Sequence, residues 1–237
     1  METELGQRKH LFTNKQLWAL LVPVVVEQIL NSLMGTADTM MVSNVGSAAI
    51  SAVSLVDSIN VLVIQVFAAL AAGGTIICSQ YMGQKNVKNA TDAAKQLIFI
   101  ITAIAVVLTA VCVVFQIPLL HLIFGKVEAE VMTNSEVYFL YTALSFPFIA
   151  VFNAGSSVFR AQENTSLPMT ISVISNIMNI VGNAILIFGF HMGVAGAALS
   201  TLISRIFCAI VVMYFLRNPK EEICVRDYIK IRPDRHK

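Results

Sequence analysis

Six apolar runs, each long enough to cross a lipid bilayer, constrain the fold of this 237-residue chain more than any other feature. A helix needs about 20 mainly apolar residues to span the hydrocarbon core. Runs of this length predict helices, because a helix satisfies its backbone polar groups internally in lipid. We therefore predict an all-α, polytopic membrane protein. The expected spans are residues 17–42, 54–78, 97–117, 137–159, 167–190 and 194–216.

The composition agrees with a membrane protein and excludes several other classes. Hydrophobic residues make up 57% of the chain and charged residues 13%, against about 25% charged residues in soluble domains. The net charge of +2 gives no broad basic field, which argues against a nucleic-acid partner. The four cysteines have no metal-ligand spacing, so we expect no metal site. Walker A, HExxH and GxSxG motifs are missing from the sequence, which argues against an ATP-driven pump or a common hydrolase.

The basic residues predict the orientation in the membrane, because cytoplasmic loops carry an excess of Lys and Arg. If the N-terminus is cytoplasmic, the four inner segments contain three, three, one and seven basic residues, and the outer loops contain only Lys126. We therefore expect both termini in the cytoplasm. The expected organisation is a cytoplasmic segment (1–16), a six-span region (17–216) and a basic tail or linker (217–237). The start is not typical of a cleavable signal peptide, because its apolar run is too long.

The first run contains three polar side chains that would share one helical face: Glu27, Asn31 and Asp38. Asp38 follows Asn31 by 7 residues and Glu27 by 11, and at about 100° per residue both spacings return to nearly the same side. Acids at bilayer depth are costly and are usually kept for a task. The pattern predicts an ion-coupling site at Asp38 and Glu27, with Asn31 lining a cavity. The alternative is a polar stripe that only holds helices together.

The fifth run carries a second polar face, formed by Ser172, Asn176, Asn179 and Asn183. Their spacing of i, i+4, i+7 and i+11 places them along one side of a helix. Amides both donate and accept hydrogen bonds, so they can bind a cation or the polar edge of a small molecule. We expect these residues to line the cavity. Hydrogen bonding between helices, worth about 0.6 kcal/mol per bond, is the alternative.

Three further residues can be placed by their position along the predicted spans. Asp57 is near the outer end of the second predicted span, where we expect a solvated carboxylate at the interface. Arg205 is within the sixth, where it either pairs with an acid of another helix or extends towards the interface. Tyr138 is at the end of the fourth, as is typical of interfacial aromatic residues.

Four segments distributed along the chain have a familiar pattern. The first, PVVVEQILNSLMGTADTMMVSNVG, combines a proline, a polar middle and an Asp-Thr pair. The others are SQYMGQKN after the second run, FRAQENTSLPM before the fifth, and NIVGNAILIFGFHMGVAGAALST between the fifth and sixth. Together they resemble the multidrug and toxic compound extrusion (MATE) family.

The resemblance implies one lobe of a two-lobe, twelve-span transporter, so the expected partner is a second six-helix lobe on the same or a separate chain. It implies an antiporter of the bacterial plasma membrane, coupled to H⁺ or Na⁺ and without another cofactor. Its substrates would be drugs or toxic amphipathic, often cationic, compounds. Asp38 matches the family's first-helix acid, and Asn179 and Asn183 match two polar positions of the fifth helix. Many relatives have an aspartate in place of Asn183, so more of the acidic role would rest on Asp38 and Glu27.

Two other functions remain open at this point. A lipid-linked saccharide flippase of the wider superfamily would need several basic residues in its cavity, and the predicted spans contain only Arg205. A non-transporting membrane scaffold would not need acids on a helix face.

Overall fold

The computed structural model describes residues 14–218 and Ile223, without the side chains of Gln16 and Asn31. The predicted segment 1–16 and tail 217–237 therefore lie almost entirely outside the described residues. Within them, the structure is helical and contains no strand. The helices are α1 (Asn14–Val42), α2 (Ser47–Gly83), α3 (Val87–Val114), α4 (Gln116–Phe124), α5 (Ala129–Leu144), α6 (Phe146–Ala161), α7 (Ser166–Asn183) and α8 (Gly193–Leu216), with a π-helical turn η1 (Ala184–Gly189) between α7 and α8.

The predicted all-α, multi-span fold is confirmed. Five helical segments are long and apolar enough to cross a membrane, and α5 and α6 together can form a sixth span that is bent by 41°. The short helix α4 was not predicted from the sequence. It begins where the third predicted run ends and carries exposed apolar side chains such as Leu122.

The bend between α5 and α6 follows from Pro147, which cannot donate a backbone hydrogen bond and clashes with the carbonyl four residues earlier. That carbonyl belongs to Ala143, and it accepts a hydrogen bond from the Thr109 hydroxyl of α3 at 3.1 Å. A neighbouring helix thus satisfies the backbone group that the proline frees, as the bilayer interior requires. In contrast, α1 continues through Pro23 as one helix.

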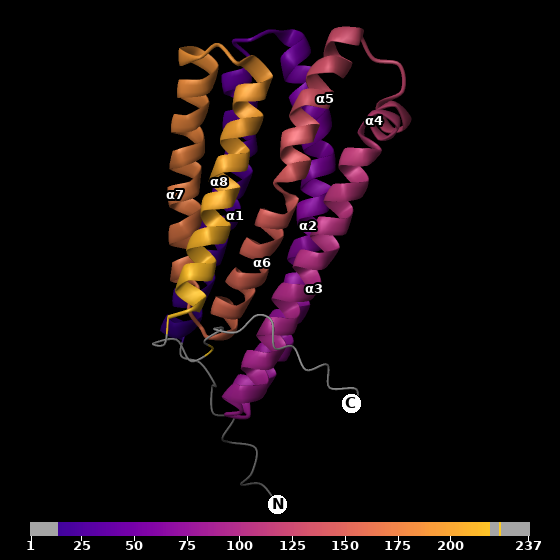
Figure 1. The fold of residues 1–237 in the computed structure, drawn as a ribbon. Coiled ribbons are helices and arrows are strands. Elements are labelled where there is room, and N and C mark those ends of the chain that lie inside the picture. Colours follow the sequence, from indigo (N-terminus) through magenta and orange to yellow (C-terminus); the bar gives the residue numbers. More distant parts are fainter. Residues whose placement is uncertain (1–13, 219–222, 224–237) are drawn as a thin grey trace, which may run out of the picture.

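The helices form a bundle with two sides (Figure 1). Helices α1, α7 and α8 pack together on one side, α2 and α3 lie on the other, and the α5–α6 span lies between them. Small residues allow close approach, as at Gly182, where a Cβ atom would overlap Ser200 Oγ of α8. This contact brings the end of α7, and with it Asn183, against α8.

Candidate functional site

Asp38 lies on α1 with its carboxylate directed at two neighbouring helices. It is only 3% exposed. Asn183 of α7 donates its amide N–H to Asp38 Oδ1. The Thr201 hydroxyl of α8 lies 3.2 Å from Oδ2 and 3.0 Å from the Ala197 carbonyl, and it can donate its one proton to either. Two residues that follow Asp38 by 145 and 163 positions in the sequence thus meet at its carboxylate.

Asn179 connects the two partners of Asp38. Its Nδ2 donates to Thr201 Oγ1 at 3.1 Å, and its Oδ1 accepts from Asn183 Nδ2 at 3.4 Å. Both asparagines are fully buried, and they face the same way because they are one helical turn apart. A Ser200 hydroxyl donates to the Asn179 backbone carbonyl at 2.9 Å and fixes α7 against α8. We call Asp38, Asn179, Asn183 and Thr201 the Asp38 cluster.

The direct partners of the Asp38 carboxylate are neutral. Within the described part of the chain, no Lys or Arg forms an ion pair with it. Asn183 Oδ1 is also buried and has no hydrogen-bond partner there. A buried carboxylate is costly unless a positive charge neutralises it. The hydrogen-bond acceptors of the cluster are all oxygen atoms, which suit a proton or a hard cation such as Na⁺.

Glu27 was expected to share this site, but the structure places it elsewhere. Its Oε2 accepts from Arg160 Nη2 of α6 at 2.7 Å, which forms an ion pair. Eleven residues of helix separate Glu27 from Asp38 by about 16 Å. Arg160 is the one basic residue of the third inner segment expected from sequence, yet it lies in the last turn of α6 with only 27% of its side chain exposed. The predicted third member of the stripe, Asn31, has a side chain outside the described part.

Ser172 and Asn176 continue the polar face of α7 beyond the Asp38 cluster. Both are buried, and Asn176 Nδ2 donates to the Ser172 carbonyl at 2.8 Å. Ser172 Oγ has no partner among the described residues. The two side chains therefore face the interior of the lobe, and neither hydrogen-bonds to Asp38 in the described part of the chain.

Sequence reasoning misplaced Asp57 and Tyr138. Helix α2 begins at Ser47, so Asp57 is well inside the helix. Tyr138 is 1% exposed and donates its hydroxyl to Asp57 Oδ1 at 3.1 Å. Asp57 is thus hydrogen-bonded inside the bundle, and Tyr138 is not an interfacial residue. The length of the apolar pattern before residue 54 would have revealed this, because SAAISAV extends the second run by two turns.

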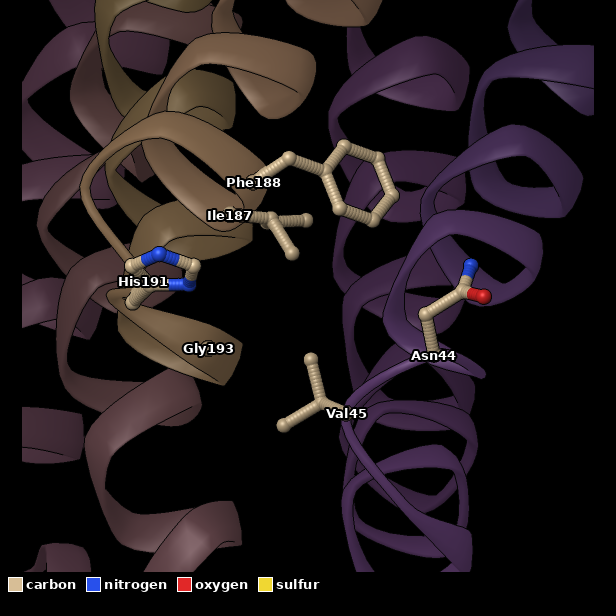
Figure 2. A pocket seen from close by; sticks show the side chains of 6 residues that line it. All are labelled: Asn44, Val45, Ile187, Phe188, His191 and Gly193. Carbon is tan, nitrogen blue, oxygen red and sulfur yellow. The ribbon is translucent and has the colours of Figure 1, made fainter.

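A small hollow of about 200 Å³ lies where α1 ends and α8 begins. Figure 2 shows its lining, with Asn44 and Val45 on one side and Ile187, Phe188 and His191 on the other. It shares no residue with the Asp38 cluster, and we assign it no role.

Comparison with known proteins identifies relatives of about twice this length. An uncharacterized transporter, YisQ, of Bacillus subtilis is 32% identical over 212 residues, which cover 87% of this chain and 46% of that protein. A probable multidrug resistance protein, NorM, of Thermotoga maritima is 29% identical over 214 residues, covering 87% and 45%. The chain thus spans about half the length of these relatives.

Solved structures show the same fold. A crystal structure of MATE in the bent conformation matches with a TM-score of 0.84 and 22% identity, covering 90% of this chain and 47% of that one. An outward-facing multidrug resistance MATE transporter matches with the same TM-score, at 21% identity, covering 93% and 49%. The profile of the MatE family matches residues 23–185, which include Asp38, Asn179 and Asn183. The chain therefore belongs to the MatE family of membrane transporters.

Proposed function

We propose that this chain is one lobe of an ion-coupled exporter in which Asp38 binds the coupling cation, H⁺ or Na⁺. The observation that carries the proposal is the buried Asp38 carboxylate, whose direct partners are the neutral side chains Asn183 and Thr201. Neutral donors hold the carboxylate in place but leave its charge uncompensated. A mobile cation can supply that charge and leave again, as a coupled transport cycle requires.

The exported compounds would be drugs or toxic amphipathic molecules, often cationic. Support comes from relatives named as multidrug resistance and multidrug export proteins. A lipid-linked saccharide flippase is not favoured, because the two arginines inside the described bundle do not form a basic cluster: Arg160 pairs with Glu27, and Arg205 contacts Ser145.

A second six-helix lobe completes the proposed transporter. This chain covers about half of each relative. A lone lobe would also leave its polar faces only partly shielded from lipid, at a cost for each exposed amide or carboxylate. The second lobe is supplied as a fusion, a separate chain or another copy of this chain.

Transport in liposomes tests the proposal. The purified chain is reconstituted with and without a second lobe, its stoichiometry is fixed by cross-linking, and movement of a fluorescent cationic dye is followed under a proton or sodium gradient. We expect gradient-driven movement only from two-lobe assemblies, and none with Asp38→Asn. Asp92→Asn is the matched control, because Asp92 has a 54% exposed side chain on α3. Efflux by a demonstrated monomer, or unchanged efflux by Asp38→Asn, would contradict the proposal.

The proposed location is the plasma membrane, with both termini in the cytoplasm. Lys88, at the start of α3, would then lie on the inner side and Lys126, between α4 and α5, on the outer side. In intact cells, an impermeant thiol reagent should label Lys126→Cys and spare Lys88→Cys. The reverse pattern would show that the orientation is inverted.

A further inference from the structure

A second polar group lies in the same bundle, on α2 and α5, and consists of the half-buried Asp57 with the buried Asn60 and Tyr138. Tyr138 donates to Asp57 Oδ1 at 3.1 Å, and Asn60 Nδ2 donates to the same oxygen at 3.2 Å. Asn60 is 3% exposed, and its Oδ1 has no partner among the described residues. The direct partners of Asp57 are therefore also neutral, and neither Asp38 nor Asp57 has an ion-pair partner at 4.0 Å or less in the described part.

Arg205 of α8 is the cation that these two acids have in common. It follows Thr201, a partner of Asp38, by one helical turn, so both side chains lie on the same face of α8. Its Nη1 donates to Ser145 Oγ at 2.6 Å, at the junction of α5 and α6. No ion pair between Arg205 and either acid is present in the described residues, so its charge can act on Asp38 and Asp57 only through space.

The charged side chains that the described contacts place between helices can be counted. They are the acids Glu27, Asp38 and Asp57 and the arginines Arg160 and Arg205. Glu27 and Arg160 neutralise each other. Two carboxylates then remain with a single guanidinium, which leaves one negative charge in excess. One proton or one Na⁺ brings the interior to neutrality.

We propose that Arg205 is a tethered internal cation shared by Asp38 and Asp57, and that it limits the lobe to one monovalent coupling charge. Asp57 is then a positioning residue. Its negative charge offsets part of the positive charge of Arg205. Asp38 therefore keeps the net negative charge that attracts the mobile ion. The inference rests on the proposed function, in which Asp38 binds that ion.

The proposal predicts a specific pattern of loss and recovery. Asp57→Asn leaves Arg205 to neutralise Asp38, so the ion should bind roughly tenfold more weakly or worse. Arg205→Gln keeps a donor for Ser145 but removes the internal cation, so uptake should rise from one towards two positive charges per chain. The double variant Asp57→Asn/Arg205→Gln restores an excess of one negative charge, and its ion affinity should return to within about threefold of the original.

Binding to the purified full chain provides the test without a need for the second lobe. Radioactive Na⁺ binding and proton uptake are measured for the original chain, the three variants, Asp38→Asn and the exposed control Asp92→Asn, with thermal unfolding to verify folding. If the original chain shows no binding that depends on Asp38, the proposed function fails. If that binding is present but Asp57→Asn leaves it unchanged, or the double variant binds no better than Asp57→Asn, the shared-cation proposal alone is overturned. Arg205→Gln is an independent arm if Asp57→Asn does not fold, and uptake that stays at one charge would contradict the proposal.

Discussion

Two acids of the same helix show how differently a buried charge can be accommodated. Glu27 and Asp38 both belong to α1, and both are 3% exposed. Glu27 meets the guanidinium of Arg160, whereas Asp38 meets the amide of Asn183 and the hydroxyl of Thr201. Burial alone therefore does not identify an ion site. The charge of the partner does, because a carboxylate that already has a fixed cation has little need of a mobile one.

The largest expected effect on stability comes from removing the fixed cation. Arg160→Met leaves Glu27 buried without a counter-charge, and breaking such a pair costs about 3–5 kcal/mol. We expect the lower end of this range, because part of the Arg160 side chain is exposed. Thermal unfolding of the detergent-solubilised chain measures the loss.

The matched control is Lys95→Met, which removes a 3.8 Å pair with Asp92; the Lys95 side chain is 17% exposed and that of Asp92 54%. Because the carboxylate left behind reaches solvent, this pair should contribute roughly 0–1 kcal/mol, as surface pairs do. Equal losses for the two variants would show that the Glu27–Arg160 pair is no more important to folding than a surface pair.

A smaller loss is expected in the Asp38 cluster when its hydroxyl is removed. Thr201→Val deprives Asp38 Oδ2 of a donor and Asn179 Nδ2 of an acceptor. Unsatisfied buried groups cost about 1–3 kcal/mol. Thr170→Val is the control, since the exposed Thr170 hydroxyl bonds only to its own helix, at the Ser166 carbonyl. If unfolding temperatures fall equally, the hydroxyl of Thr201 has no special role in holding Asp38.

Substituting Glu27, the other member of the ion pair, should destabilise the fold less than substituting Arg160. Glu27→Gln leaves the guanidinium of Arg160 without a carboxylate, but 27% of that side chain is exposed and can reach solvent or headgroups. The new amide can still accept a hydrogen bond. We expect a loss of about 1 kcal/mol, near the net value of one hydrogen bond. A loss as large as that of Arg160→Met would show that an unpaired Arg160 destabilises the fold as much as an unpaired Glu27.

The sequence predicted the helices and their polar faces better than the contacts between them. Apolar length and periodicity depend on neighbouring residues, so the spans and the face with Asn179 and Asn183 could be read directly. Arg160 and Asn183, the partners of Glu27 and Asp38, are more than 130 positions away from these acids, and no local pattern encodes such a pairing. For the same reason Glu27 and Asp38, equivalent by spacing on one helix, could not be separated before the structure placed Arg160 beside only one of them.

The smallest effect on stability should come from the substitution with the largest effect on transport. Asp38→Asn removes a charge that forms no ion pair in the described part of the chain. The single oxygen of the new side chain can still accept from Asn183, and its amide can donate to the Thr201 hydroxyl. Because an isolated buried charge is itself costly, we expect unfolding to shift by less than about 1 kcal/mol, in either direction. The same variant should lose Asp38-dependent ion binding, measured on the same preparation, while Asp92→Asn retains it. A loss of stability as large as that of Arg160→Met would mean that the negative charge of Asp38 holds the bundle together. The contrast between a structural ion pair at Glu27 and an ion site at Asp38 would then be wrong.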